Sequence, residues 1–523
     1  VVHSGKYRRG NMQSIFGTNG EESPEPVKAE VKGSLPAWLQ GTLLRNGPGL
    51  FSVGKSEYNH WFDGMSLIHS FTFCNGVVTY RSKFLKSDTY KRNIKADRIV
   101  VSEFGTMIYP DPCKNIFSRA FTHLSNIVPD FTDNNLINII RYGQDYYASS
   151  EVNYMNQIDP ATLETVGRIN YRNHIALNLA TAHPHYDTEG NTYNMGTAIM
   201  GFGLPKYIIF KVPADQICSI PFRSTLFPSY FHSFGMTDNY IVFVEQPYKL
   251  DIVKLATAYF RGVNWGSCLK ICAPCRLSLF MANGKMTLFH VINRKTGKAM
   301  STHFYGDALV VFHHINAYEA DDHVVFDLIS YTNSNLYDMF YIHNMRQDTG
   351  SFMESNKNVP MPVCQRFVLP LDDAPQGSNL VTLTGTTATA LMQEDGSVYC
   401  QPDTLFDGLS GGLELPAINY NFNAKKYRYF YGSRMERSAH PNKVKHVEWR
   451  EENCFPSEPV FVASPGAVEE DDGVILSSVI SPDPNIFSFM LVLDAKTFTE
   501  IARASIPANV HMDLHGHFIP AAV

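Results

Sequence analysis

Histidines recur at similar distances behind a short turn motif. The motif is an apolar residue, Asp or Asn, two spacers and Thr, and its copies begin at Ile158, Ile292 and Leu493. A histidine follows the Asp or Asn of each copy after 20 to 24 residues: His183, His313 and His515. A fourth turn-like segment, Val212 to Asp215, precedes His232. Imidazole is a good ligand for iron and other transition metals, so four histidines that converge would form a metal site.

Each of three histidine clusters contains a competing residue. His313 and His314 are adjacent and must face opposite sides of a strand, so only one of them faces a central site. His185 shares a face with His183, and His517 shares a face with His515. The turn spacing alone does not choose within any of these pairs.

Short β-rich runs between turn residues dominate the chain and predict an all-β fold. They include residues 76–85, 145–158, 240–246, 308–331 and 474–480. The three turn motifs are 134 and 201 residues apart, which is two and three times 67, and seven such units fit within 523 residues. Equal antiparallel units of this size are typical of a β-propeller. We therefore expect one domain over residues 1–523, with residues 1–40 as an N-terminal extension.

Charge and composition exclude several classes of function. The net charge is −6, which gives no basic excess for binding nucleic acid. No Gly-rich phosphate loop opens a helix, which removes the main support for nicotinamide or flavin chemistry. The nine scattered cysteines predict a reduced, cytoplasmic protein.

Two amphipathic stripes could lie in a membrane interface. The residues 116–128 and 252–260 combine an apolar helical face with flanking Lys or Arg, as interfacial helices do. Packing on the protein itself is the alternative for such a stripe. The membrane-contact candidates are Phe117, Phe121, Leu124, Leu255 and Phe260.

A set of short motifs resembles the carotenoid cleavage oxygenase family in order from about Gly41 to Ile519. The motifs are LRNGPG (44–49), HWFDG (60–64), ATAHPH (180–185), YFHSFG (230–235), FHHIN (312–316), ELP (414–416), PSEP (456–459) and HGHF (515–518). The resemblance implies a seven-bladed β-propeller with one ferrous iron on its axis. It also implies that the iron ligands and catalytic residues are His183, His232, His313 and His515, the first histidine of each pair.

The resemblance assigns further roles. It implies that Glu151, Glu414 and Glu458 accept the second N–H of the ligand imidazoles, as carboxylates near metal sites commonly do. It implies a cap of helices and loops that carries an apolar substrate tunnel and membrane-facing segments. Phe104 matches a tunnel position, and Ser150, the second tunnel candidate, stands where relatives often carry Thr. Cys113 matches a position discussed as a lipid attachment site in a related isomerase.

The implied reaction is cleavage of a carotenoid double bond by O₂, with Fe²⁺ as cofactor, at a membrane surface that the protein binds peripherally. Residues 264–270, 287–294 and 329–333 look most like the insect carotenoid isomerooxygenases. This predicts central 15,15' cleavage coupled to trans-to-cis isomerisation. The alternatives are eccentric 9',10' cleavage, a retinoid isomerase that consumes no O₂, and a carotenoid-binding propeller without enzymatic activity.

Overall fold

The computed structural model describes most of the chain. The described residues are 17, 20–108, 132–199, 204–212, 218–224, 227–271, 286–371, 378–406, 412–433, 436–439 and 445–521. Side chains are not described at 218–224, 436–439, 445–446, 256, 259, 260, 270 and 349. The described residues form mostly β-strands, as the sequence predicts.

The strands form seven sheets of four or more strands within the described residues. The first has the order β1 (Ser23–Lys28), β7 (Val77–Phe84), β6 (Met65–Cys74), β3 (Gly41–Leu50) and β38 (His515–Pro520). The second has β11 (Thr165–Asn170), β10 (Tyr154–Ile158), β9 (Asp145–Ser149) and β8 (Asn138–Tyr142). The third has β12 (Leu179–Ala180), β14 (Thr192–Ala198), β15 (Lys206–Val212) and β16 (Cys218–Ser224), with β13 (His185–Tyr186) beside β14.

The remaining large sheets follow in chain order. The fourth has β17 (Gly235–Met236), β18 (Tyr240–Glu245), β21 (Met286–Asn293), β22 (Phe304–Asp307), β27 (Val398–Gln401) and β26 (Thr389–Met392). The fifth has β23 (Val310–Ala320), β24 (His323–Tyr331), β25 (Val363–Pro370) and β28 (Asp403–Phe406). The sixth has β29 (Glu414–Ala417), β30 (Tyr429–Ser433), β31 (Glu436–Ala439) and β32 (Lys445–Glu448). The seventh has β2 (Glu30–Gly33), β37 (Glu500–Ser505), β36 (Phe489–Asp494), β35 (Gly473–Ile480) and β33 (Phe455–Pro456), with β34 (Val460–Ala463) beside β35.

Shorter elements lie outside these sheets. Two-stranded sheets pair β4 (Ser52–Val53) with β5 (Ser56–Glu57) and β19 (Tyr248–Leu250) with β20 (Leu269–Ile271). The α-helices are α1 (Asp88–Ala96), α3 (Ile252–Arg261), α4 (Asn335–Met339), α5 (Ile342–Met345) and α6 (Thr349–Ser355). The 3₁₀ helices are η2 (Trp61–Asp63), η3 (Tyr171–Asn173), η4 (Gly266–Cys268) and η5 (Tyr420–Phe422). Among the described residues, no helix has the length and apolar character that crossing a membrane requires.

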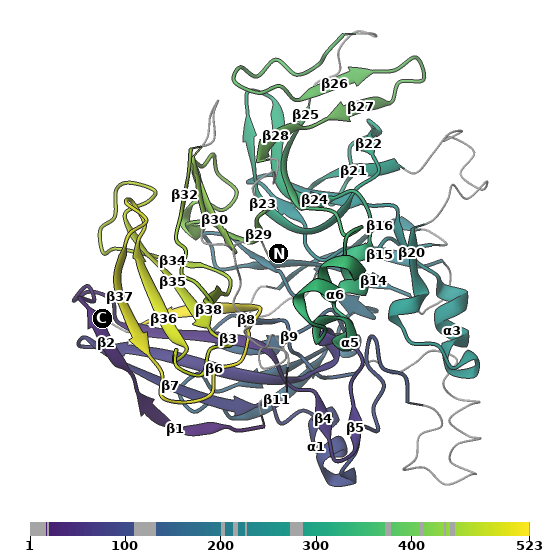
Figure 1. Ribbon diagram of the computed structural model, residues 1–523. Coiled ribbons are helices and arrows are strands. Elements are labelled where there is room, and N and C mark those ends of the chain that lie inside the picture. Colours follow the sequence, from purple (N-terminus) through teal and green to yellow (C-terminus); the bar gives the residue numbers. More distant parts are fainter. Residues whose placement is uncertain are drawn as a thin grey trace.

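Figure 1 shows the large sheets arranged around a common centre, which is a propeller-like fold. The edge strands β38 and β8 lie side by side, as do β17 and β23, and β23 and β29. The purple N-terminal strands and the yellow C-terminal strands share sheets, since β3 pairs with β38 and β2 pairs with β37. Within the predicted N-terminal extension of residues 1–40, β1 pairs with β7 and β2 pairs with β37, so this segment contributes strands to two of the large sheets.

The three turn motifs lie where the sequence predicts hairpins. The side chain of Asp159 accepts hydrogen bonds from the backbone N–H groups of Ala161 and Thr162, which stabilises the turn between β10 and β11. Asn293 and Asp494 make the equivalent contacts in their own turns. After each hairpin the chain enters the edge strand of another sheet: β12, β23 or β38. This crossing explains why histidines follow the motifs at similar distances.

Apolar side chains fill the space between neighbouring sheets. Phe289 of β21 packs against Phe326 of β24 and Phe367 of β25, with ring centroids 5.6 and 4.7 Å apart. All three rings are buried. Burial of one such side chain contributes about 1.5 to 3 kcal/mol, so contacts of this kind hold adjacent sheets in a fixed relation. The edge strands that carry the histidines are thereby fixed as well.

The helix predicted over residues 252–260 is present as α3. Asp251 caps its first turn by accepting a hydrogen bond from the backbone N–H of Lys254, and Gly262 ends it with a positive φ. Leu255 is only 3% exposed and packs against Leu250 and Cys268, so its predicted membrane contact is wrong. The side chain of Phe260 and the whole predicted segment 116–128, with Phe117, Phe121 and Leu124, lie outside the described residues, as does Cys113.

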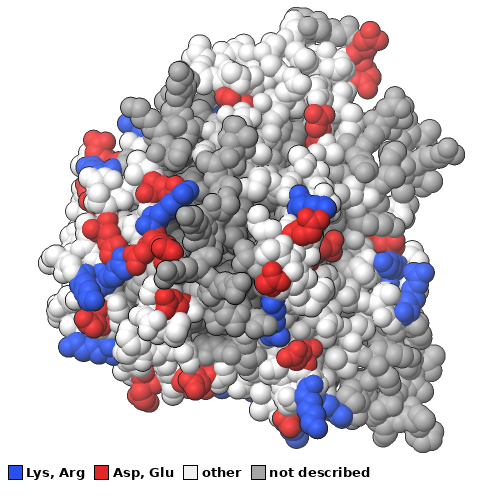
Figure 2. Space-filling model, in the orientation of Figure 1, with Lys and Arg blue, Asp and Glu red and all other residues white. Residues whose placement is uncertain are grey.

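Acidic and basic side chains alternate over the face drawn in Figure 2. Neither sign gathers into a large patch among the described residues of that face.

Candidate metal centre

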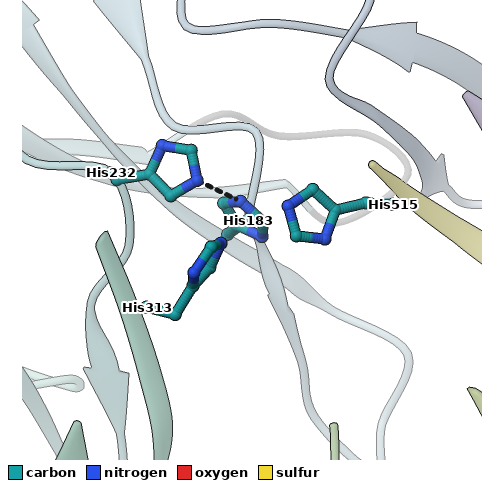
Figure 3. Close-up of side chains that lie close together, drawn as sticks. All are labelled: His183, His232, His313 and His515. Atoms are coloured by element: carbon teal, nitrogen blue, oxygen red, sulfur yellow. Dashed lines mark hydrogen bonds between the residues drawn. The ribbon is translucent and has the colours of Figure 1, made fainter. Parts of the chain in front are cut away.

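Four histidines from distant parts of the chain meet in one cluster, called the central group below. His183 lies between β12 and β13, His232 precedes β17, His313 is in β23 and His515 begins β38. Their nearest ring nitrogens all lie within 4.8 Å of one another, and Figure 3 shows the rings converging from different sides. The Nε2 atoms of His183 and His232 are 2.9 Å apart. The structure thus brings together the four histidines that the family resemblance implies.

A bulge in β23 separates His313 from His314. The pairing of β23 with β24 shifts register on both sides of His314, and such a bulge re-aims side chains. His313 enters the central cluster, whereas Nδ1 of His314 lies 3.0 Å from the hydroxyl of Ser233. His314 therefore faces the neighbouring sheet.

The other two competing histidines are also engaged elsewhere. Both ring nitrogens of His185 have partners, at 3.0 Å from Oδ1 of Asn423 and 2.9 Å from the carbonyl oxygen of Phe234. The ring of His517 packs beside Tyr146. Neither belongs to the central group.

Three of the central imidazoles donate Nδ1–H to a carboxylate. His232 donates to Glu151 at 2.5 Å, His313 to Glu414 at 2.7 Å and His515 to Glu458 at 2.6 Å. A proton held on Nδ1 leaves the lone pair of a neutral imidazole on Nε2, which faces the centre. The described residues supply no carboxylate partner for His183. All three glutamates are those that the resemblance implies.

Each glutamate is held by a second donor that the sequence analysis missed. Tyr230 donates its hydroxyl to Glu151 at 3.0 Å, and Tyr331 donates to Glu414 at 2.6 Å. Arg45 donates to Glu458 at 2.7 Å and to Asp513 at 2.9 Å. Arg45 and Tyr230 lie within the family motifs, but nothing in their local pattern indicates these contacts.

Burial and neighbouring groups shift the pKa values of His183, His515 and Glu414 downward, which favours neutral imidazoles for the two histidines and an ionised Glu414. Burial, together with the nearby His515 and His232, lowers the pKa of His183 well below its usual value. Burial also lowers the pKa of His515, although Glu458 opposes the shift. Burial raises the pKa of Glu414, but the His313 imidazole and the hydrogen bonds to this carboxylate outweigh it, so that the pKa lies below its ordinary value. Neutral imidazole is the form that binds a metal.

The donor set fits a transition-metal ion. Nε2 of His313 is buried without a hydrogen-bond partner, which is costly unless something else binds it. Two nitrogens bound about 2.1 Å from one ion at right angles would be about 3.0 Å apart, close to the His183 and His232 separation. Four neutral nitrogens without thiolate suit iron better than structural zinc.

An apolar cavity of about 770 Å³ reaches the histidines. His232, His313 and His515 line it, and most of the other lining side chains are aromatic or aliphatic. Phe104 and Ser150, for which the sequence predicts a place in a substrate tunnel, both line this cavity, and so does Leu255 of α3. The arrangement places a metal site beside a pocket that suits a long apolar molecule.

Comparisons with known proteins identify the family. The family model described as retinal pigment epithelial membrane protein matches residues 16–520. A β,β-carotene 15,15'-dioxygenase of Gallus gallus is 55% identical, with 97% of this chain and 98% of that protein covered. The β,β-carotene 15,15'-dioxygenase of Homo sapiens is 52% identical (97% and 95% covered), and the human mitochondrial carotenoid-cleaving dioxygenase is 42% identical (96% and 90% covered).

Solved structures agree on the fold. The cobalt-substituted apocarotenoid oxygenase of Synechocystis superposes with a TM-score of 0.74 at 21% identity, with 98% of both chains covered. The relatives above 50% identity are vertebrate carotene dioxygenases, so the comparisons support the predicted family but not its insect branch specifically. The chain belongs to the retinal pigment epithelial membrane protein family, the family of the carotenoid oxygenases.

Proposed function

We propose that this protein is an iron(II)-dependent carotenoid dioxygenase that cleaves the central 15,15' double bond. The observation that carries the proposal is the four-histidine cluster, three members of which line an apolar cavity. The activity named for the relatives at 52 to 55% identity supports the substrate class and the central position. We further propose that the seven large sheets are the blades of one propeller with the metal on its axis.

When bound, the ion would supply the binding and activation of O₂ next to the substrate. His183, His232, His313 and His515 would hold it through Nε2, while the glutamates retain the Nδ1 protons and fix the ring orientations. The ring of Phe312 lies 5.6 Å from that of His232 and would position the polyene. The apolar walls would exclude water from reactive species.

The overall reaction balances without a reductant. One carbon–carbon double bond breaks, and each of the two carbons gains one oxygen atom from the same O₂ molecule. Central cleavage of a symmetric carotene therefore yields two aldehydes of the same chain length, whereas eccentric cleavage yields two products of different length. We also propose that isomerisation accompanies cleavage, which would give one cis and one trans aldehyde.

The test is chromatography of the products after incubation of the iron-loaded protein with β,β-carotene, with O₂ uptake recorded in parallel. We expect a single aldehyde chain length and one O₂ consumed for every carotene cleaved. Two chain lengths would indicate eccentric cleavage. Bound carotene without O₂ uptake would indicate a carrier, and retinoid isomerisation without O₂ uptake would indicate an isomerase.

We propose that the protein works in the cytoplasm and binds membranes peripherally to reach its substrate. Val253 on α3 is 68% exposed, so this helix presents an apolar side chain to its surroundings while Leu255 lines the cavity. A helix with these two faces could take an apolar molecule from a membrane to the pocket.

A further inference from the structure

A buried carboxyl group lies on the cavity wall and has no role in the cleavage step. Glu103 is 2% exposed and lines the cavity that His232 and His313 also line. The hydroxyl of Thr132 donates a hydrogen bond to Oε1 of Glu103 at 2.6 Å. Among the described residues, Oε2 has no hydrogen-bond partner. A polar atom left unpaired in an apolar site costs free energy, which a matching ligand group would recover.

A series of aromatic rings along the cavity connects the neighbour of Glu103 with the histidine group. This neighbour, Phe104, has its ring centroid 6.4 Å from that of Tyr337, which lies 4.9 Å from Phe312. Phe312 in turn contacts His232 at 5.6 Å. Three ring-to-ring contacts thus separate His232 from Phe104. A polyene with its central bond at the histidines would extend along the cavity past these rings.

The environment of Glu103 favours the protonated acid. Burial raises its pKa well above the usual range, and the nearby carboxylates of Asp63 and Asp133 act in the same direction, whereas the Thr132 hydrogen bond opposes them. Because Oε1 accepts a hydrogen bond from Thr132, the proton of the neutral acid would be carried by Oε2. A neutral acid held in this way donates one hydrogen bond to a ligand oxygen and imposes no unpaired charge on an apolar cavity.

We propose that Glu103 is a specificity-determining residue that hydrogen-bonds an oxygen atom at the end of a polyene substrate. The oxygen is a ring hydroxyl of a carotenoid or the carbonyl of an apocarotenal, since both accept a hydrogen bond from Oε2–H. This inference rests on the proposed carotenoid cleavage. Neutral hydrogen bonds of this kind change rate constants by about 3- to 10-fold, which is the size of discrimination expected here.

The test compares substrates within one enzyme preparation, so that losses of stability or iron cancel. For wild type, Glu103→Leu and Glu103→Gln, kcat/KM is measured with β,β-carotene, with a monohydroxylated β-carotene and with an apocarotenal. We expect Glu103→Leu to lower the ratio of oxygenated to unoxygenated substrate about 3- to 10-fold. Glu103→Gln, whose amide also donates, keeps the ratio within about 2-fold of wild type. If kcat/KM falls only for the hydroxylated substrate, Glu103 binds the ring hydroxyl; if it falls only for the apocarotenal, Glu103 binds the carbonyl oxygen.

If Glu103→Leu leaves the kcat/KM ratio of oxygenated to unoxygenated substrate unchanged, the proposal is wrong. The hydrogen bond between Thr132 and Glu103 would then have only a structural role. If Glu103→Leu does not fold, Raman spectra of an apocarotenal bound to wild type and to Glu103→Gln replace it. If the carbonyl stretching frequency of the apocarotenal bound to wild type equals its frequency in hydrocarbon solvent, the carbonyl accepts no hydrogen bond and that alternative is wrong. If the substrate ratio is unchanged in Glu103→Ala, the hydroxyl alternative is wrong. Failure of wild type to cleave β,β-carotene would instead contradict the proposed function.

Discussion

For three of the central imidazoles, the orientation of the ring is fixed by a hydrogen bond on the side that faces away from the candidate metal site. A carboxylate on Nδ1 turns Nε2 of His232, His313 and His515 toward the common centre. The glutamates differ in their own support, because tyrosine hydroxyls hold Glu151 and Glu414, whereas the Arg45 guanidinium holds Glu458. The positive charge of Arg45 beside Glu458 reduces the negative charge that His515 experiences. We therefore expect His515 to be a weaker ligand for the metal than His232 and His313.

Replacement of any central histidine by Ala should abolish iron binding and turnover. The reason is that each contributes one nitrogen to a group whose members all lie within 4.8 Å. Iron per chain, measured by atomic absorption, is the readout. His185→Ala and His314→Ala are the matched controls, since their ring nitrogens face other partners. Full iron retention in two of the four central variants would contradict the assignment.

Glu414→Gln should weaken iron affinity by about 10- to 100-fold, because a neutral amide accepts the Nδ1 proton of His313 less strongly than a carboxylate does. Tyr331→Phe removes only the hydrogen bond to Glu414 and should have a smaller effect in the same direction. Competition with a chelator measures both. Glu354→Gln, at an exposed ion pair with Lys357, is the control and should leave the affinity unchanged.

At the scale of elements, α3 is a helix with one face toward the cavity and another face exposed on the surface. Leu255 points into the protein, where it packs on Leu250 and lines the cavity, while Val253 is exposed. Residues two positions apart lie on different faces of a helix, so a single short segment can meet both solvent and cavity.

Val253→Asp should reduce the flotation of the protein with liposomes and leave the melting temperature unchanged. Leu255→Asp should lower the melting temperature, because it buries a charge without a partner. Val468 is 87% exposed outside α3, so Val468→Asp controls for added negative charge. Equal flotation of Val253→Asp and wild type would mean that α3 does not contact the membrane.

At the scale of the whole molecule, the metal site depends on the pairing of chain segments from both ends. β3 and β38 are hydrogen-bonded neighbours, with Asn46 opposite His515 and Arg45 opposite Gly516. A single pair of strands therefore carries His515 and the Arg45 that supports its glutamate. Pairing of β3 with β38 therefore brings a histidine of the central group close to the guanidinium that supports its glutamate.

Gly516→Ala should lower both the melting temperature and the iron content. An added Cβ would collide with the carbonyl oxygen of Leu44 and with Cδ of Arg45, which forces β38 away from β3. Gly350→Ala is the control, because its Cβ would meet only Oδ1 of Asp348 at 3.3 Å. Thermal unfolding and metal analysis of both variants measure the effects. A Gly516→Ala protein with normal iron would show that the site tolerates displacement of this strand.

The amino-acid sequence by itself determined the features that act over short distances along the chain. The strands, the hairpins closed by Asp159, Asn293 and Asp494, and the helix at 252–260 follow from side-chain alternation and local capping, which involve residues a few positions apart. The histidines and glutamates of the centre were predicted from ordered motifs, and the structure brings them together.

Only the tertiary structure decided what depends on contacts between distant segments. Tyr230, Tyr331 and Arg45 reach their glutamates across 79, 83 and 413 residues, and no local pattern specifies such pairs. The burial of Leu255 and the pairing of β1 and β2 with large sheets likewise depend on which surfaces meet after folding. An amphipathic stripe in the sequence shows only that one face of the helix is apolar. The packing of the whole chain decides what covers that face, because burial is a property of the assembled fold.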